Sequence, residues 1–129
     1  METSNIKYSD YNCAQKVAFA LYPFVKDKID KETLFKVTEG LGGGGCGTHQ
    51  GTCGALSGAQ VIIGLAISSA NLENPNSKSK TYDFGFEISN SFQKELGSYI
   101  CGPIKKANYC DKAIEVAISL ATQKLKLLQ

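Results

Sequence analysis

The sequence predicts an all-α fold, a single-domain bundle of about five helices with a buried central helix and a Gly-rich loop. Apolar residues recur at three- and four-residue intervals in five stretches, and no stretch shows the alternation typical of a strand. Residues that favour helix ends flank these stretches. The chain of 129 residues is long enough for one domain, residues 1–129, with its own core.

Two helices are expected before the glycine tract. Ser9 or Asp10 can cap the first, which we expect to close at Pro23 and the charged residues 26–28. Asp30 can cap a short second helix that runs into Gly40. Glycine in a helix costs roughly 1 kcal/mol relative to alanine, so the tract over residues 42–45 is expected to be irregular. The apolar positions of the two helices are Cys13, Val17, Ala20, Leu21, Phe24, Leu34, Phe35, Val37 and Leu41.

The third helix is expected over residues 53–70, with Thr52 as its cap. Gly54 and Gly58 lie one turn apart on one face, so another helix could approach that face closely. The other faces are apolar as well, which predicts the central, mostly buried helix of the bundle.

A polar loop then leads to two further helices. The fourth is expected from about Ser79 to Leu96, with Gly97 as its C-terminal cap. We expect Cys101 to lie in an irregular link with Gly102 and Pro103, and Asn108 to cap the last helix. The apolar stripes of these helices are Tyr82, Phe86, Ser89, Phe92 and Leu96, and then Cys110, Ala113, Ile114, Ala117, Ile118, Ala121 and Leu125.

Composition narrows the classes of partner. The fourteen basic residues are all lysines and the net charge is only +2, without a basic block, which argues against nucleic acid. The longest apolar stretch, residues 55–70, is shorter than the roughly 20 residues of a membrane span. The N-terminus has no apolar signal core and the cysteine count is odd, so a cytoplasmic protein with reduced thiols is expected.

The five cysteines are the candidates for chemistry. Cys13, Cys53 and Cys110 fall where a helix is expected to begin, a position that lowers the pKa of a thiol. Cys53 is the first choice, because flanking glycines are expected to leave its sulfur accessible. The alternative role is a small buried apolar residue, which suits Cys13 on its apolar face. For Cys110 the two roles are balanced, since a neighbouring aspartate opposes a thiolate and nearby lysines favour one.

The glycine tract is a candidate binding site for a cofactor or a sulfur. Residues 40–45 match G-x-G-x-x-G by letters, but they follow a helix rather than a strand, so we exclude a dinucleotide fold. The backbone amides of Gly43, Gly44, Gly45 and Gly54 could approach a cofactor or a sulfur, or the tract could be a flexible connector.

A metal site is a further possibility. Cys46, His49 and Cys53 could ligate a soft metal together with Cys13, Cys101 or Cys110. The spacing matches neither zinc knuckles nor iron–sulfur runs, so the fold would have to assemble the ligands. Without a C-x-x-C-H motif, c-type haem is excluded.

Several of these residues resemble a known family. Asn12-Cys13-Ala14-Gln15, the Gly-Gly-Gly loop, residues 52–59 and Gly97-Ser98 with two later cysteines are similar to the small redox-active proteins named for the C_GCAxxG_C_C pattern. The resemblance covers about residues 11–117 and assigns the signature cysteines to Cys13, Cys53, Cys101 and Cys110.

The resemblance also implies a scaffold and shows two departures. Related domains occur in split-Soret cytochromes, which implies a helical scaffold that often forms dimers. Family members commonly carry an arginine in the loop where this chain has residues 47–50, so an anion-handling role is not expected here. Cys46 is additional to the signature, as an extra ligand or a resolving thiol.

Two functional hypotheses follow. The first is a redox protein in which the four signature cysteines converge, either cycling between thiols and disulfides or holding an iron–sulfur cluster or another thiolate-bound metal that passes electrons. Its partner would be a redox protein or a small-molecule electron donor or acceptor. The second is a non-catalytic helical module, with the cysteines in its core and its small-residue helix against a partner or a second copy.

Overall fold

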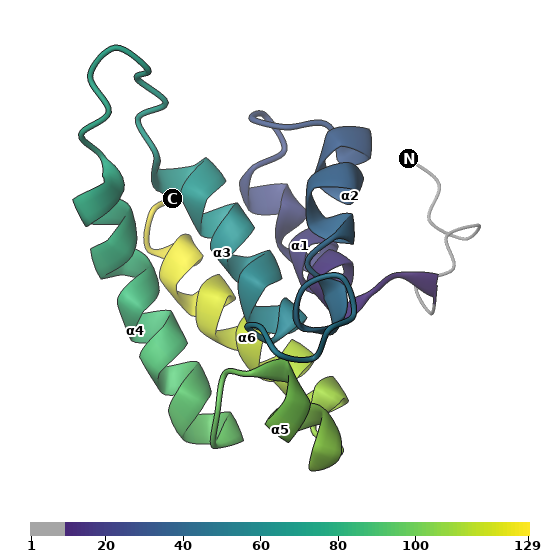
Figure 1. Cartoon of the computed structure of the whole chain (residues 1–129). Coiled ribbons are helices and arrows are strands. Elements are labelled where there is room, and N and C mark those ends of the chain that lie inside the picture. Colours follow the sequence, from purple (N-terminus) through teal and green to yellow (C-terminus); the bar gives the residue numbers. More distant parts are fainter. Residues whose placement is uncertain (1–9) are drawn as a thin grey trace.

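The computed structural model describes residues 10–129, and in this part of the chain it is all-α, as predicted (Figure 1). Six α-helices and two short 3₁₀ turns follow one another without a strand in the described residues. No helix among them is long and apolar enough to cross a membrane. The elements are α1 (Cys13–Leu21), η2 (Tyr22–Phe24), α2 (Lys31–Glu39), η3 (Gly42–Gly44), α3 (Gly54–Ile67), α4 (Lys78–Leu96), α5 (Cys101–Lys106) and α6 (Cys110–Lys126).

Polar side chains join the beginning of α1 to α2. The N-cap of α1 is Asn12, not the expected Ser9 or Asp10, and Ser9 lies outside the described residues. Asn12 Oδ1 accepts from Gln15 N–H (2.9 Å) and Gln15 Oε1 accepts from Asn12 N–H (3.0 Å), which completes a capping box. Asn12 Nδ2 also donates to the carbonyl of Glu39 (2.8 Å), and Gln15 Nε2 to that of Phe35 (3.1 Å). These bonds fix the start of α1 against α2.

Helix α3 is the central helix, as expected, and it contacts α1, α4 and α6 (Figure 1). It starts after Cys53, which is its N-cap in place of the expected Thr52, and it ends at Ile67 rather than near residue 70. Most residues from Gly54 to Ile63 are buried, whereas the last turn is half-buried. The end of α3 that carries Cys53 is therefore the part held most firmly in the core.

Helix α4 ends as predicted, with Gly97 in the left-handed conformation at φ 82°. Part of its expected stripe is wrong, because Tyr82 and Phe86 are 66% and 69% exposed. The core face consists instead of residues four apart in the sequence. Tyr82 and Phe86 lie two positions from residues of this face, which is a rotation of about 200° around the helix, so their side chains point to the side opposite the core face. The residues of this face are Phe84, Ile88, Phe92 and Leu96.

Helix α5 was not expected, so residues 10–129 contain six helices rather than five. Pro103 is its third residue, a position where a missing N–H costs little, so Gly102 and Pro103 do not prevent the helix. Helix α6 follows with Tyr109 as its N-cap rather than Asn108, which has φ 64° in the preceding turn. Its stripe of alanines and Leu125 is buried as predicted, but Cys110 is exposed and does not belong to it.

Candidate thiol site

All four signature cysteines lie where a helix begins. Cys13, Cys101 and Cys110 are the first residues of α1, α5 and α6, and Cys53 is the N-cap of α3. The predicted helix starts at Cys13, Cys53 and Cys110 are thus confirmed, and the irregular link expected around Cys101 is wrong. All five cysteines are free thiols in this structure.

Cys13 lies against the start of α3 because α1 crosses α3 so closely that a side chain larger than a hydrogen atom would not fit at Gly54 or Gly58. A methyl group on Gly54 would meet Cys13 Sγ and lie 3.1 Å from the carbonyl oxygen of Leu41, and one on Gly58 would meet the carbonyl oxygen of Ala14. The predicted close approach to the small-residue face is therefore confirmed, with α1 as the approaching helix. It places the Cys13 sulfur against the residue that follows Cys53.

Cys53 and Cys101 are held together by a short antiparallel contact. Thr52 and Ile100 form an isolated bridge, beside which Cys53 N–H donates to the carbonyl of Tyr99 (2.6 Å). On the other side, Cys101 N–H donates to the carbonyl of Gly51 (2.9 Å). In this pairing the two cysteines are diagonal neighbours on one face. The sequence carries no strand pattern here, so nothing in it indicated the contact.

The glycine tract forms an ordered turn that covers Cys101. Hydrogen bonds hold it in place: Gly45 N–H donates to the carbonyl of Gly42 (3.2 Å), and His49 N–H donates to the carbonyl of Gly43 (2.7 Å). A methyl group on Gly44 would lie 2.6 Å from Cys101 Cβ and 2.9 Å from His49 Cα. These contacts do not fit a flexible connector. Glycine is required here because the backbone is packed against a cysteine at positive φ.

Two further predictions concern the glycines: their backbone conformation and their binding of a cofactor. Gly43, Gly44 and Gly45 all have positive φ, as expected of a tract that only glycine can follow easily. Gly54 serves the contact with Cys13. Binding of a cofactor by these four residues stays a prediction.

Burial, rather than the helix end, decides the ionisation of Cys53. Its residue is only 5% exposed, and burial raises the pKa of its thiol to about 11. The backbone N–H groups of Ala55 and Leu56 lower this pKa, but by less than burial raises it, and the neighbouring thiols of Cys13 and Cys101 raise it further. The expectations of an accessible sulfur and a lowered pKa at Cys53 are therefore wrong.

Burial and neighbouring thiols also act on Cys101. Burial raises the pKa of Cys101, and the charges of Cys13 and Cys110 raise it further, whereas Lys105 lowers it. Lys105 lies four residues later, one turn along α5 and on the same face. Cys13, Cys53 and Cys101 thus interact with one another, and Cys110 joins them through Cys101.

These interactions do not amount to a set of metal ligands. Electrostatic effects reach well beyond the roughly 2.3 Å of a metal–thiolate bond. In residues 10–129 no group of three or more histidine, cysteine, aspartate or glutamate side chains is arranged to hold a metal ion. Cys46 is exposed at φ 49°, with its sulfur 3.7 Å from where a Gly40 Cβ would stand, and His49 has φ 63°. The structure does not bring Cys46 or His49 together with the other four cysteines as ligands.

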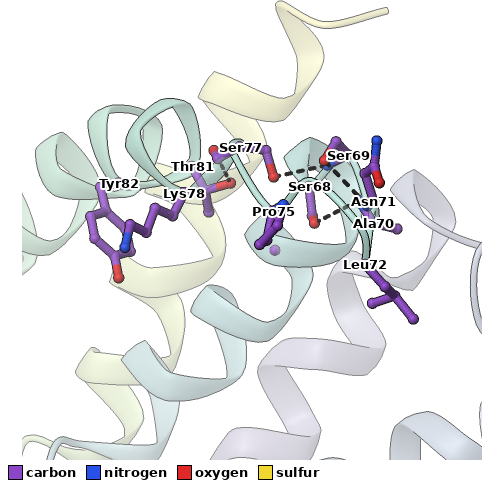
Figure 2. Close-up of a pocket in the computed structure, with 11 residues that line it drawn as sticks. Ser68, Ser69, Ala70, Asn71, Leu72, Pro75, Ser77, Lys78, Thr81 and Tyr82 are labelled. Carbon is purple, nitrogen blue, oxygen red and sulfur yellow. Dashed lines mark hydrogen bonds between the residues drawn. The ribbon is translucent and has the colours of Figure 1, made fainter.

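A pocket of about 480 Å³ lies elsewhere, where α3 passes into α4 (Figure 2). Its hydroxyl groups are used in local turns: Ser77 Oγ accepts from Ser69 N–H (3.0 Å) and Ser68 Oγ from Ala70 N–H (3.1 Å). None of the cysteines lines it. We therefore assign it no part in the thiol site.

Comparison with known proteins agrees with the cysteine pattern. A family profile described as "Putative redox-active protein (C_GCAxxG_C_C)" matches residues 11–124, which is most of the chain. No curated protein and no solved structure matches the chain significantly.

Proposed function

Since this chain belongs to the C_GCAxxG_C_C family of redox-active proteins, we propose that it works by thiol–disulfide exchange, with Cys13 and Cys53 as the pair that forms the disulfide. The observation that supports this most is the convergence of Cys13, Cys53 and Cys101 from three helix starts. Cys13 is preferred as the partner of Cys53 because its sulfur lies against Gly54.

The proposed reaction transfers two electrons. Cys13 and Cys53 lose two protons and two electrons and form one sulfur–sulfur bond, while an external disulfide takes them up and becomes two thiols. A thiol with a pKa of about 11 is ionised in only about one molecule in 10⁴ at pH 7, so Cys53 is a poor attacking group. We assign the first attack within the pair to Cys13, which is half-buried, and the resolving role to Cys53.

The alternatives have less support. A metal centre with Cys46 as an additional ligand would need three or four donors around one ion, an arrangement not present in the described residues. A purely structural role is favoured only by the membership of Cys53 in the hydrophobic core. Cytoplasmic localisation, a homodimer and the identity of the redox partner stay predictions.

Redox titration tests the proposal. The reduced protein is equilibrated with glutathione buffers of different poise, unreacted thiols are alkylated, and disulfides are mapped by peptide mass spectrometry. We expect one reversible Cys13–Cys53 disulfide, lost in Cys13→Ser and in Cys53→Ser and retained in Cys46→Ser, the matched control. Circular dichroism of each variant verifies folding.

Two results would count against it. If Cys13 and Cys53 stay fully alkylatable in the folded protein at the most oxidising poise, thiol exchange at this pair is wrong. If protein purified without oxygen carries stoichiometric iron with thiolate-to-metal absorption bands that are lost in Cys13→Ser, the cysteines hold a metal centre instead.

A further inference from the structure

A buried dithiol needs a route by which external disulfides reach it. Cys53 and Cys101 are only 5% and 7% exposed, and the glycine turn packs on Cys101. Cys13 is half-buried at the contact with α3. Cys110 is the one signature cysteine that is exposed.

Cys110 is also connected to the buried thiols. Helix α5 has only six residues and packs against α6 (Figure 1). Because six helical residues span only about 9 Å, Cys101, the first of them, stays within a short distance of the turn that leads into α6. Tyr109 N–H donates to the carbonyl of Ile104 (3.0 Å), which closes the turn between the two helices. Cys110 also raises the pKa of the Cys101 thiol, because two neighbouring thiolates would repel each other.

The turn that carries Cys110 is basic. Residues 105–112, which we call the basic turn, are all exposed and contain Lys105, Lys106 and Lys112 against a single acid, Asp111. Lys112 Nζ lies 5.0 Å from the centre of the Tyr109 ring and donates to the carbonyl of Glu95 (3.3 Å), which keeps its charge beside the start of α6. Asp111 offsets one of the three positive charges, so the turn retains a charge of +2.

We propose that Cys110 is the thiol that attacks external disulfides, that Cys101 resolves the product, and that the basic turn selects disulfides flanked by negative charge. This rests on the proposed exchange at Cys13 and Cys53. The Cys110 thiolate attacks one sulfur of R–S–S–R, a mixed disulfide forms, and one R–S⁻ leaves and takes a proton. Cys101 then attacks the Cys110 sulfur, expelling the second R–S⁻, and the new Cys101–Cys110 disulfide is passed inward by exchange. The sum is two R–SH and one Cys13–Cys53 disulfide.

The test compares three small disulfides of different charge: glutathione disulfide, which is anionic, bis(2-hydroxyethyl) disulfide, which is neutral, and cystamine, which is cationic. The rate of Cys13–Cys53 disulfide formation is followed by quenched alkylation. We expect Cys110→Ser to slow the reaction with glutathione disulfide on the order of tenfold or more, while the fully oxidised end state is still reached. Cys46→Ser, which removes the other exposed thiol, should leave the rate unchanged.

Charge is tested by one lysine at a time. For Lys106→Glu, the ratio of the glutathione disulfide rate to the cystamine rate should fall on the order of tenfold at low salt and by much less at 0.5 M salt, since exposed charges are screened. Lys80→Glu, near the first turn of α4, is the matched control and should keep the wild-type ratio. Because the ratio is compared between variants, the intrinsic reactivity of each disulfide cancels.

A cystine-bridged peptide with flanking acids distinguishes the source of the substrate. A faster reaction with this peptide than with glutathione disulfide at equal concentration favours a protein disulfide, and the reverse favours a small molecule. The proposal is overturned if Cys110→Ser reacts as fast as wild type, or if Lys106→Glu leaves the charge ratio unaltered. Failure of the underlying function looks different, since wild type would then form no Cys13–Cys53 disulfide with any of the oxidants.

Discussion

The contact between α1 and α3 can be tested by adding single methyl groups to two glycines of the same helix. In Gly58→Ala the new Cβ would overlap the Ala14 carbonyl oxygen and lie 3.0 Å from Ala14 C and Cα. These are backbone atoms that cannot rotate away, so the helices must separate, at a typical overpacking cost of about 1–3 kcal/mol. In Gly64→Ala nothing lies within 4 Å of the new Cβ, so only the helix propensity of alanine acts, a gain of up to about 1 kcal/mol.

Both variants gain propensity, so their difference isolates the steric cost. We expect the unfolding free energy of Gly58→Ala to lie about 1–3 kcal/mol below that of Gly64→Ala, measured by urea unfolding, which for a chain of this size is a difference of several degrees in Tm. Gly58→Ala should also slow formation of the Cys13–Cys53 disulfide, because it moves α1 away from α3. Equal stability of the two variants would refute the close crossing, and with it the placement of Cys13 beside Cys53.

Three further predictions concern the glycine turn, Cys53 and the cap of α1. Gly44→Ala and Gly47→Ala both place alanine at a positive φ, but only the methyl group of Gly44→Ala meets Cys101. The unfolding free energy of Gly44→Ala, measured in urea, should therefore lie about 1–3 kcal/mol below that of Gly47→Ala, and Cys101 should be alkylated faster in Gly44→Ala. Because burial raises the pKa of Cys53 from 9.0 to about 11, the unfolded state loses its proton first, and stability that is complete below pH 9 should fall between pH 9 and 11, on the order of 2 kcal/mol. Cys53→Ala should show a correspondingly smaller fall, and an identical pH profile would contradict the burial argument. Asn12→Ala should lower the unfolding free energy by about 1 kcal/mol through loss of the capping box, and an unchanged midpoint would count against it.

The predictable parts of this fold are those that depend on residues close in sequence. Gly97 ends α4 because a left-handed residue is needed there, and Asp30 caps α2 by accepting from Thr33 N–H (2.9 Å). The small-residue face of α3 could also be predicted, because Gly54 and Gly58 are four residues apart and therefore lie on the same side of the helix. Each of these features is decided within about one turn of helix.

The features that could not be predicted depend on contacts between distant segments. Cys53 is buried in the hydrophobic core, beside the pairing of residues 51–53 with residues 99–101, and no local pattern in the sequence indicates that pairing. The sequence showed the helix start at Cys53, which lowers its pKa, but not the burial, which raises the pKa by more. Tyr82 and Phe86 also fit a helical stripe, yet they are exposed, because packing against α3 and α6 selects the face that contains Ile88.

The ionisation of Cys53 also determines how the proposed disulfide would be reduced. In thiol–disulfide exchange the sulfur with the lower thiol pKa leaves faster, so expulsion of Cys53 is disfavoured. An attacking thiolate should therefore bond to the Cys53 sulfur and release Cys13. Cys101 is the thiol placed for this attack, because the bridge at Thr52 and Ile100 holds it diagonally beside Cys53. Burial raises the pKa of the Cys101 thiol as well, so this attack is slow at neutral pH and becomes faster as the pH rises. The geometry of the bridge and the burial of Cys53 thus favour the same order of exchange, in which electrons pass from Cys110 through Cys101 to the inner pair.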